Sequence, residues 1–136
     1  MQKFCLEPTS STPEIIFSPE ENIFLIRGIS SPEDVRTVYY PVTEWVKTFI
    51  DDILERPVKA YSTDNPLKLQ IDLEYFNSSS VKFIYDILLE IKRASKAGIP
   101  VIIEWYHDFE DLDLRAAGTE IALLAEMDFI YIQKYK

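Results

Sequence analysis

The chain is poor in several residue types on which functional sites are commonly built. Its 136 residues include one cysteine, one histidine and three glycines. The single Cys5 excludes an internal disulfide framework and a zinc site made of cysteine thiolates. The sequence also has neither a glycine-rich phosphate loop nor a nucleophile elbow. These absences leave few residues for a catalytic site, and we expect neither an enzyme nor a bound cofactor.

Positive charge is also scarce. Lysine and arginine number 14 against 23 acidic residues, which gives a net charge of −9. This charge repels phosphate backbones and anionic lipid surfaces, so neither nucleic acid nor a membrane is an expected partner. No apolar run approaches the roughly 20 residues of a spanning helix, and the first residues lack the apolar segment of a secretion signal. We expect a cytoplasmic protein with protein partners.

Short β-rich runs and amphipathic runs alternate along the chain, and 47% of its residues are apolar. Periodicity predicts strands over 14–19, 22–28, 67–76, 99–106 and 129–134, and helices over 31–55, 78–98 and 110–127. The order β-β-α-β-α-β-α-β favours right-handed crossovers between largely parallel strands. We therefore expect one α/β domain over residues 1–136, with helices packed on a mixed, mostly parallel sheet.

Single residues allow finer predictions about the helix and the connection in the first half of the chain. Ser31 and Pro32 suit the N-cap and first position of the first helix. Pro41 lacks an amide hydrogen, so we expect it to bend the helix near Tyr40 or to restart it. The proline-rich segment 56–66 is predicted to be the longest connection.

Strand patterns predict which side chains are buried. In the strand over 67–76, one face collects Leu67, Leu69, Ile71, Leu73 and Tyr75. The nearly continuous apolar run over 99–106 is typical of a strand covered on both faces. Four aromatic residues are predicted to be core rather than exposed anchors, namely Tyr39 and Tyr40 in the helix over 31–55 and Trp105 and Tyr106 in the strand over 99–106.

Asn77 and three serines stand between a predicted strand and a predicted helix. Asn77 or one of the serines can cap the helix by accepting a hydrogen bond from a free amide, which contributes about 1 kcal/mol. The same position would also accept a phosphate on Ser78, because the helix dipole and Lys82 favour negative charge there. Carboxylates nearby in the sequence would oppose it, namely Asp72, Glu74 and Asp86. The residues alone favour the cap and leave the phosphate switch open.

One acidic segment deserves comparison with a metal site, because carboxylates and one imidazole suit Mg²⁺, Mn²⁺ or Fe²⁺. Its candidate ligands are His107, Asp108, Glu110, Asp111 and Asp113. Acidic residues just before a helix also suit the helix dipole and solvent. We expect the second role, and therefore no metal, while a small metal-dependent enzyme stays as an alternative.

Several motifs in order resemble the SiaC-type regulatory phosphoproteins, formerly a domain of unknown function and similar to the anti-sigma-factor antagonists of the STAS fold. "YFNSSSVKFIYDIL" resembles the family's strand–Asn–Ser/Thr–Ser–Ser–helix signature, and "STPEIIF" and "GISSPED" resemble its early motifs. "EWYHDFEDLDLRAAG" is similar to a Trp-Tyr-Tyr motif followed by acidic residues and a glycine. Here His107 replaces the usual Tyr, and Ala116 and Thr119 replace usual acidic residues.

This resemblance implies a STAS-like fold and a partner-switching function. The residue directly after the Asn is the phosphorylated hydroxyl in the family, which corresponds to Ser78; Asn77, Ser79, Ser80 and Lys82 would form the surrounding switch surface. A kinase would phosphorylate the domain, and a metal-dependent serine/threonine phosphatase would reverse this. The unmodified form would bind a target, by resemblance a diguanylate cyclase. A constitutive interaction adaptor without a switch is the other alternative.

Overall fold

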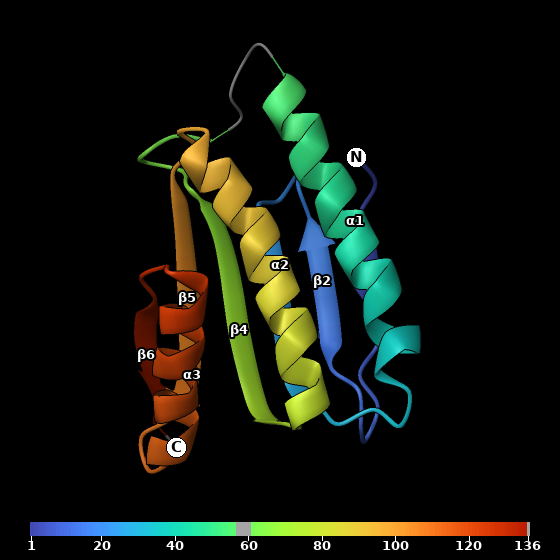
Figure 1. Ribbon diagram of the computed structural model, residues 1–136, viewed down its shortest axis with the longest axis vertical. Coiled ribbons are helices and arrows are strands. Elements are labelled where there is room, and N and C mark those ends of the chain that lie inside the picture. Colours follow the sequence, from blue (N-terminus) through green and yellow to red (C-terminus); the bar gives the residue numbers. More distant parts are fainter. Residues whose placement is uncertain (57–60, 136) are drawn as a thin grey trace.

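Six strands form one sheet and three helices lie against it (Figure 1). The computed structural model describes residues 1–56 and 61–135. The elements in chain order are β1 (Phe4–Leu6), β2 (Glu14–Ser18), β3 (Ile23–Ser30), α1 (Val35–Glu55), β4 (Leu67–Phe76), α2 (Ser78–Lys96), β5 (Val101–Asp108), α3 (Leu112–Ala125) and β6 (Ile130–Lys134). The predicted order is confirmed, and β1 is an additional strand whose three residues are too few to show an alternation.

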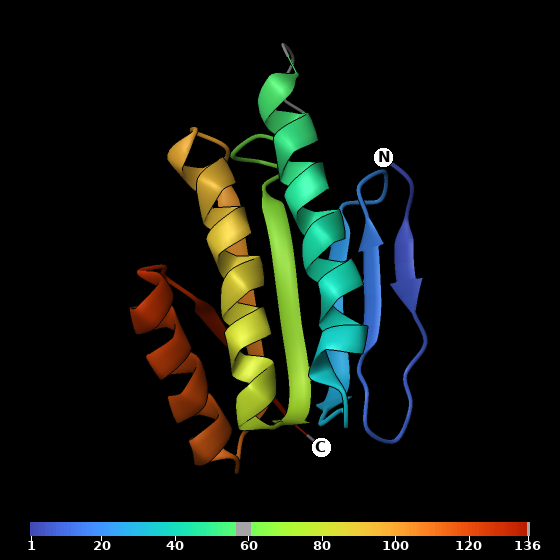
Figure 2. The ribbon, with the colours of Figure 1, turned by 45° about the vertical axis from the view of Figure 1, so that its right-hand side comes forward.

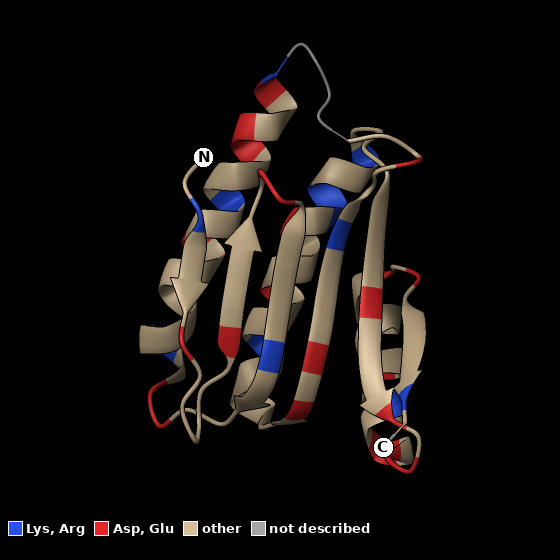
Figure 3. Cartoon of the chain, turned by 180° about the vertical axis from the view of Figure 1, so that it is seen from behind, with Lys and Arg blue, Asp and Glu red and all other residues tan. Residues whose placement is uncertain are grey.

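The strands lie in the sheet in the order in which they occur in the chain. The pairs β1–β2 and β2–β3 are antiparallel, whereas β3–β4, β4–β5 and β5–β6 are parallel. Because each right-handed crossover moves one strand further in the same direction, every connecting helix falls on the same face. Figure 2 shows α1, α2 and α3 side by side over that face, and Figure 3 shows the opposite, open face.

The prediction that the strand over 99–106 is covered on both faces is wrong. In β5 the side chains of Ile103, Trp105 and His107 are buried, and the residues between them are partly exposed on the open face. Ile102 is apolar although it lies on the open face, so the sequence of the strand does not show the alternation. The helices and the inner face of the sheet enclose the apolar core, in which Ile15, Ile26, Ile50, Ile71 and Ile84 are fully or almost fully buried.

The first helix begins later than predicted. Its N-cap is Asp34, whose carboxylate accepts hydrogen bonds from the amides of Arg36 and Thr37 and from the Thr37 hydroxyl, the last at 2.8 Å. The Thr37 hydroxyl is the main reason why the pKa of Asp34 is lowered. Ser31 instead donates its amide to the Ser11 carbonyl at 2.8 Å. The assignment of Ser31 and Pro32 as cap and first helical residue is therefore wrong.

The helix α1 continues through Pro41 and is not restarted there; the bend near Tyr40 stays a prediction. Of the predicted connection over 56–66, residues 57–60, including Pro57, lie outside the described residues. Residues 61–66 contain neither helix nor strand.

The strand β4 carries a bulge that changes the side on which its last residues lie. Leu67, Leu69, Ile71 and Leu73 are buried as predicted. Opposite β3 the register then shifts, so that Gly28 pairs with Leu73 but Ile29 pairs with Tyr75. The extra residue is Glu74, and it turns Tyr75 outward to 56% exposure. The prediction that Tyr75 shares the buried face is wrong for this reason, and Phe76 packs against the core instead.

Candidate functional site

The parallel strands β3, β4 and β5 end at the same edge of the sheet, at the bottom of Figure 1, and α2 begins there. Asn77 is the N-cap of α2, and its side-chain oxygen accepts a hydrogen bond from the Ser80 amide at 3.0 Å. The Asn77 amide donates to the Ser30 carbonyl at 2.9 Å, which fastens the turn to β3. The predictions that Ser78 lies at the strand–helix junction and that this turn caps the helix are both confirmed.

The three serines occupy different environments. Ser78, the first residue of α2, is exposed, and its hydroxyl makes no hydrogen bond to any described residue. Ser79 is also exposed, but its hydroxyl donates to the Asn77 side-chain oxygen at 3.1 Å. Ser80 is completely buried. Ser78 is therefore the serine whose hydroxyl is both exposed and unengaged.

Ser80 does not belong to a surface, contrary to the prediction that placed it on the switch surface. Its hydroxyl lies 2.7 Å from the Asn77 side-chain oxygen and 2.8 Å from the Ser30 hydroxyl. The Ser30 hydroxyl in turn lies 2.6 Å from the Tyr39 hydroxyl on α1. Every group is satisfied when Tyr39 donates to Ser30, Ser30 to Ser80 and Ser80 to Asn77. We call Asn77, Ser80, Ser30 and Tyr39 the buried hydroxyl chain.

The buried hydroxyl chain joins the start of α2 to β3 and α1. Tyr39 and Ser30 are both fully buried, and burial raises the pKa of the Tyr39 phenol although the hydrogen bond with Ser30 opposes the shift. The Tyr39 ring also stacks on Phe83 of α2 at 5.6 Å. Sequence patterns did not reveal Ser30 as part of the site, because it lies 50 residues from Ser80 and nothing local marks the pair.

Lys82 lies one turn beyond Ser78 and is exposed. Its ammonium group pairs with Asp86 at 2.8 Å and lies 4.9 Å from the centre of the Phe83 ring. Of the predicted opposing carboxylates, Asp72 is paired with Lys134 at 2.6 Å and Glu74 is exposed at the bulge. The start of α2 thus offers free amides and one cation on its own surface, with Glu74 as an exposed carboxylate nearby.

Two exposed aromatic residues lie near the first turns of α2. Tyr75 lies two residues before Asn77, and Tyr40, which is 54% exposed, lies against Phe83 with ring centroids 5.7 Å apart. The core prediction is confirmed for Tyr39 and Trp105 but wrong for Tyr40. The reason is that neighbouring residues on a helix point about 100° apart, so only Tyr39 faces the sheet.

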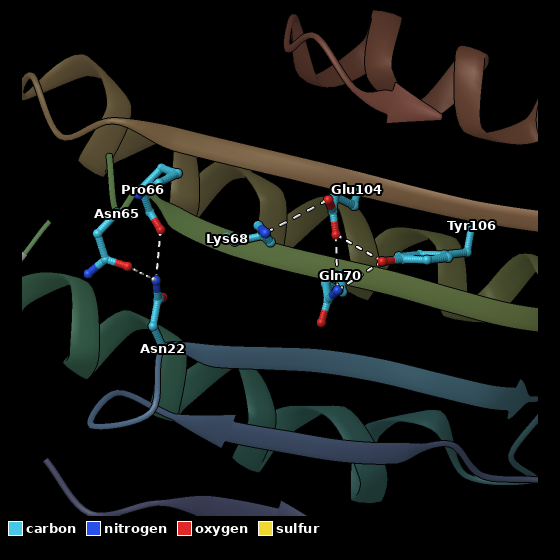
Figure 4. A network of polar contacts seen from close by, with 7 residues as sticks. All are labelled: Asn22, Asn65, Pro66, Lys68, Gln70, Glu104 and Tyr106. Carbon is cyan, nitrogen blue, oxygen red and sulfur yellow. Dashed lines mark hydrogen bonds and ion pairs between the residues drawn. The ribbon is translucent and has the colours of Figure 1, made fainter. Parts of the chain in front are cut away.

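Tyr106 is not a core residue either, because it belongs to a polar network on the open face (Figure 4). Its hydroxyl donates to Glu104 at 2.9 Å and accepts a hydrogen bond from Gln70 at 2.9 Å. Burial and the neighbouring Glu104 carboxylate both raise the pKa of Tyr106. Lys68 completes the network with a 4.0 Å ion pair to Glu104. This network crosses the sheet between β4 and β5 and makes no contact with the serines.

The acidic segment does not assemble a metal centre in the part of the chain that the structure describes, where no group of three His, Cys, Asp or Glu side chains is placed to hold a metal ion. Asp111 is the N-cap of α3 and accepts from the Leu114 amide at 2.9 Å. Asp113 lies in the first turn of the same helix. Both carboxylates lie at the N-terminus of α3, where the helix dipole favours negative charge, as the helix-dipole interpretation predicted.

None of the helices within residues 1–56 and 61–135 has the length and apolar content needed to cross a membrane.

A family model described as "SiaC family regulatory phosphoprotein" matches residues 6–134, almost the whole chain. The chain belongs to the SiaC family. It is 32% identical over 100 residues to an uncharacterized protein of Pseudomonas aeruginosa strain UCBPP-PA14, a match that covers 74% of this chain and 71% of that protein. The sequence resemblance is thereby confirmed.

Solved structures of SiaC share the fold. The chain matches the crystal structure of apo-SiaC from Pseudomonas aeruginosa with a TM-score of 0.73 and 27% identity, over 99% of this chain and 100% of that chain. It also matches the crystal structure of the diguanylate cyclase SiaD in complex with its activator SiaC from the same organism. That match has a TM-score of 0.78 and 26% identity, over 96% of this chain and 97% of that chain. The chain is thus a SiaC-family regulatory phosphoprotein with the α/β fold of its relatives.

Proposed function

We propose that this SiaC-family protein is a partner switch whose phosphorylated residue is Ser78. The unmodified form binds and regulates a target protein, a diguanylate cyclase as for the SiaC of Pseudomonas aeruginosa. A kinase adds the phosphate and a serine/threonine phosphatase removes it. The observation that carries this proposal is the environment of Ser78: among the three serines, it alone combines an exposed position at the start of α2 with a hydroxyl that has no partner among the described residues.

A phosphate on Ser78 is compatible with the folded domain. The amides of the first helical turn and the helix dipole stabilise negative charge at this position by about 0.3–1 kcal/mol when it is exposed. Repulsion from exposed carboxylates such as Glu74 is weakened by solvent and salt. Ser80 is the structural serine, because a phosphate there would replace buried hydrogen bonds to Asn77 and Ser30. The modification therefore changes the surface and leaves the fold intact.

The same phosphate opposes docking. A partner surface shaped for a hydroxyl would have to desolvate a group of nearly two negative charges, and a buried charge without a partner is costly. Tyr40 and Tyr75 are both more than half exposed, and tyrosine is enriched among residues that dominate binding energies. The proposed switch thus introduces a charge at the end of α2 near which these two exposed aromatic residues lie. The domain acts by binding and not by catalysis.

The test compares a negative charge at two neighbouring serines. Unmodified protein is used as bait to isolate the target, and binding is then measured by calorimetric titration. We expect Ser78→Asp to weaken binding at least about tenfold, where one decade is 1.4 kcal/mol, and Ser78→Ala to bind like the wild type. Ser79→Asp is the matched control, since it adds the same charge one residue along, and we expect a smaller loss.

Melting curves of all the variants separate the two ways in which binding could fail. We expect Ser78→Asp to melt close to wild type. Unfolding of Ser78→Asp would mean that the charge acts by destabilisation, and this contradicts the proposed mechanism. Binding of Ser78→Asp as tight as wild type would instead leave Ser78 as part of the helix start and favour the constitutive adaptor.

A further inference from the structure

A polar cavity of about 200 Å³ lies between the start of α3 and the ends of β4, β5 and β6. It is several times larger than the roughly 30 Å³ that one water molecule occupies, so it can admit a small planar group. Its lining comprises Leu73, Glu74, His107, Asp108, Asp111, Leu114 and Lys134. The bulged Glu74 lies four residues before Ser78, so the cavity opens at the same edge of the sheet as the switch site.

The charges at the cavity favour a cation. Lys134 contributes the only ammonium group of the lining, and it is already paired with Asp72 at 2.6 Å. Glu74 and Asp108 are exposed, and their carboxylates make no hydrogen bond to any described residue. Asp111 uses one carboxylate oxygen as the α3 cap and has a second. Counting Asp72 with the lining gives four carboxylates against one ammonium group, so the cavity has an excess of acceptors.

His107 supplies an acceptor that is independent of the acidic residues. Its side chain is only 3% exposed, and its Nε2 is buried without a hydrogen-bond partner. Nδ1 lies 3.0 Å from the Asp108 carbonyl, which can only accept, so in the neutral ring Nδ1 carries the proton and Nε2 carries a lone pair. A buried acceptor without a donor costs about 1–3 kcal/mol. Because His107 also lines the cavity, a ligand bound there can supply this donor.

We propose that this cavity is a receptor for the guanidinium group of an arginine presented by a protein partner. Guanidinium carries five N–H donors in a planar fork and no acceptor. One edge of the fork can donate to a carboxylate, and another N–H can donate to Nε2 after a small shift of the His107 side chain, which lines the cavity but keeps Nε2 buried. A lysine ammonium lacks this planar spacing, and among the described residues no group of three metal-ligating side chains is placed to hold a metal ion. The proposal deepens the proposed function, because it supplies a contact at the same edge of the sheet as Ser78 that recognises a basic residue of the docking protein.

The chain has a single histidine, so the ¹⁵N signals of its imidazole report on this site without interference from other histidines. The protein is titrated with Nα-acetyl-arginine amide up to about 100 mM at constant ionic strength and pH. Nα-acetyl-citrulline amide, which has the same shape without the charge, is titrated in parallel. We expect a saturable shift, larger at Nε2 than at Nδ1, with the arginine derivative and none with citrulline.

Two variants and one matched control test the carboxylates. We expect Glu74→Gln and Asp108→Asn each to weaken the arginine response about two- to fivefold, as loss of an exposed charge pair does. Glu110→Gln removes an exposed charge from the same loop outside the cavity lining, and we expect it to respond like the wild type. The proton–nitrogen spectrum of each variant verifies that the fold is retained.

Absence of a His107 shift, an equal response to citrulline, or an unchanged response in Asp108→Asn would each overturn the arginine receptor. None of these results bears on Ser78, because the titration uses neither the partner nor the phosphate. Conversely, a Ser78→Asp variant that binds its target normally would overturn the proposed switch and leave the arginine response as it is.

Discussion

Three consecutive serines of this chain have the same chemistry and different surroundings, and the surroundings decide what each can do. Ser78 and Ser79 are exposed, whereas Ser80 is fully buried and hydrogen-bonded to Asn77 and Ser30. A kinase can reach an exposed hydroxyl at a helix start, and it cannot reach one that forms part of a buried network. The position of each residue in the first helical turn therefore separates the proposed acceptor from its structural support.

The buried hydroxyl chain should be measurable as stability. Ser80→Ala leaves the Asn77 oxygen and the Ser30 hydroxyl without one of their buried partners, so we expect it to lower the free energy of unfolding by roughly 1–3 kcal/mol. Ser79→Ala removes an exposed hydroxyl of the same turn and should change it by no more than about 0.5 kcal/mol. Equilibrium denaturation of both variants provides the comparison. Equal stabilities would show that the buried chain contributes nothing.

The roles of single residues could be predicted where the residues that determine them lie close together in the sequence. Asn77 before the serines predicted the cap and the place of Ser78, because capping depends on residues two or three positions apart. The Ser30–Ser80–Tyr39 contacts could not be predicted, since Ser30 meets Ser80 only through the pairing of β3 with β4. For the same reason, the cavity around His107 was not foreseen: its lining comes from four separate elements.

Among the elements, those with strong periodicity were predicted well. The alternation of β4 and the apolar stripe of α2 are both present, and Gly98 follows the helix with a φ of +93°, as expected of the residue after a C-cap. The errors lie at ends and irregularities. Both Asp34 and Ser31 are residue types that cap helices well, so the sequence did not show that Asp34 is the cap. The bulge at Glu74 turns Tyr75 to the exposed face, and no residue type in the strand indicates a bulge there.

The packing of α3 on β5 gives a prediction at this scale. A Cβ atom on Gly118 would lie 2.6 Å from the Trp105 indole nitrogen. The indole cannot easily move away, because it donates to the Leu114 carbonyl at 3.1 Å and stacks on Phe129. We therefore expect Gly118→Ala to destabilise the protein by roughly 1–3 kcal/mol, even though alanine favours a helix over glycine by about 1 kcal/mol.

Thermal or chemical unfolding of Gly118→Ala beside Thr119→Ala checks this packing. Thr119 is the exposed neighbour on α3, so its truncation should change stability by no more than about 0.5 kcal/mol. A Gly118→Ala protein more stable than the wild type would mean that α3 does not approach Trp105 closely.

At the scale of the whole molecule, the sequential strand order divides the domain into two unlike faces. All three helices lie on one face, and the open face carries polar networks such as the Gln70–Glu104–Tyr106 group. The composition and element order predicted the α/β class and the mostly parallel sheet. They did not predict that one face stays open, because the crossover rule gives that result only once the order of strands across the sheet is known.

Buried phenols make the whole fold sensitive to alkaline pH. Burial raises the pKa of Tyr61 to about 12, above the value of about 10 in an unfolded chain. A group with a raised folded-state pKa contributes its full stability below the unfolded pKa and loses it as the pH rises through the folded pKa. We therefore expect stability to fall between about pH 10 and pH 12, with Tyr39 and Tyr106 shifted in the same direction.

Between pH 9 and pH 11, the free energy of unfolding of Tyr61→Phe should fall by about 1 kcal/mol less than that of the wild type, because the variant has no phenol to ionise at this position. Urea denaturation of both proteins at the two pH values gives this difference. An identical pH dependence would show that the Tyr61 phenol ionises as readily in the folded protein as in the unfolded one.

The central claim is that a phosphate on Ser78 controls partner binding without altering the fold. The most direct measurement uses protein that carries phosphoserine at position 78 and the unmodified protein, each titrated against the same isolated target and each melted under the same conditions. The account predicts that the phosphorylated protein binds at least about tenfold more weakly and melts close to the unmodified protein. Equal affinity of the two forms for the target would contradict it.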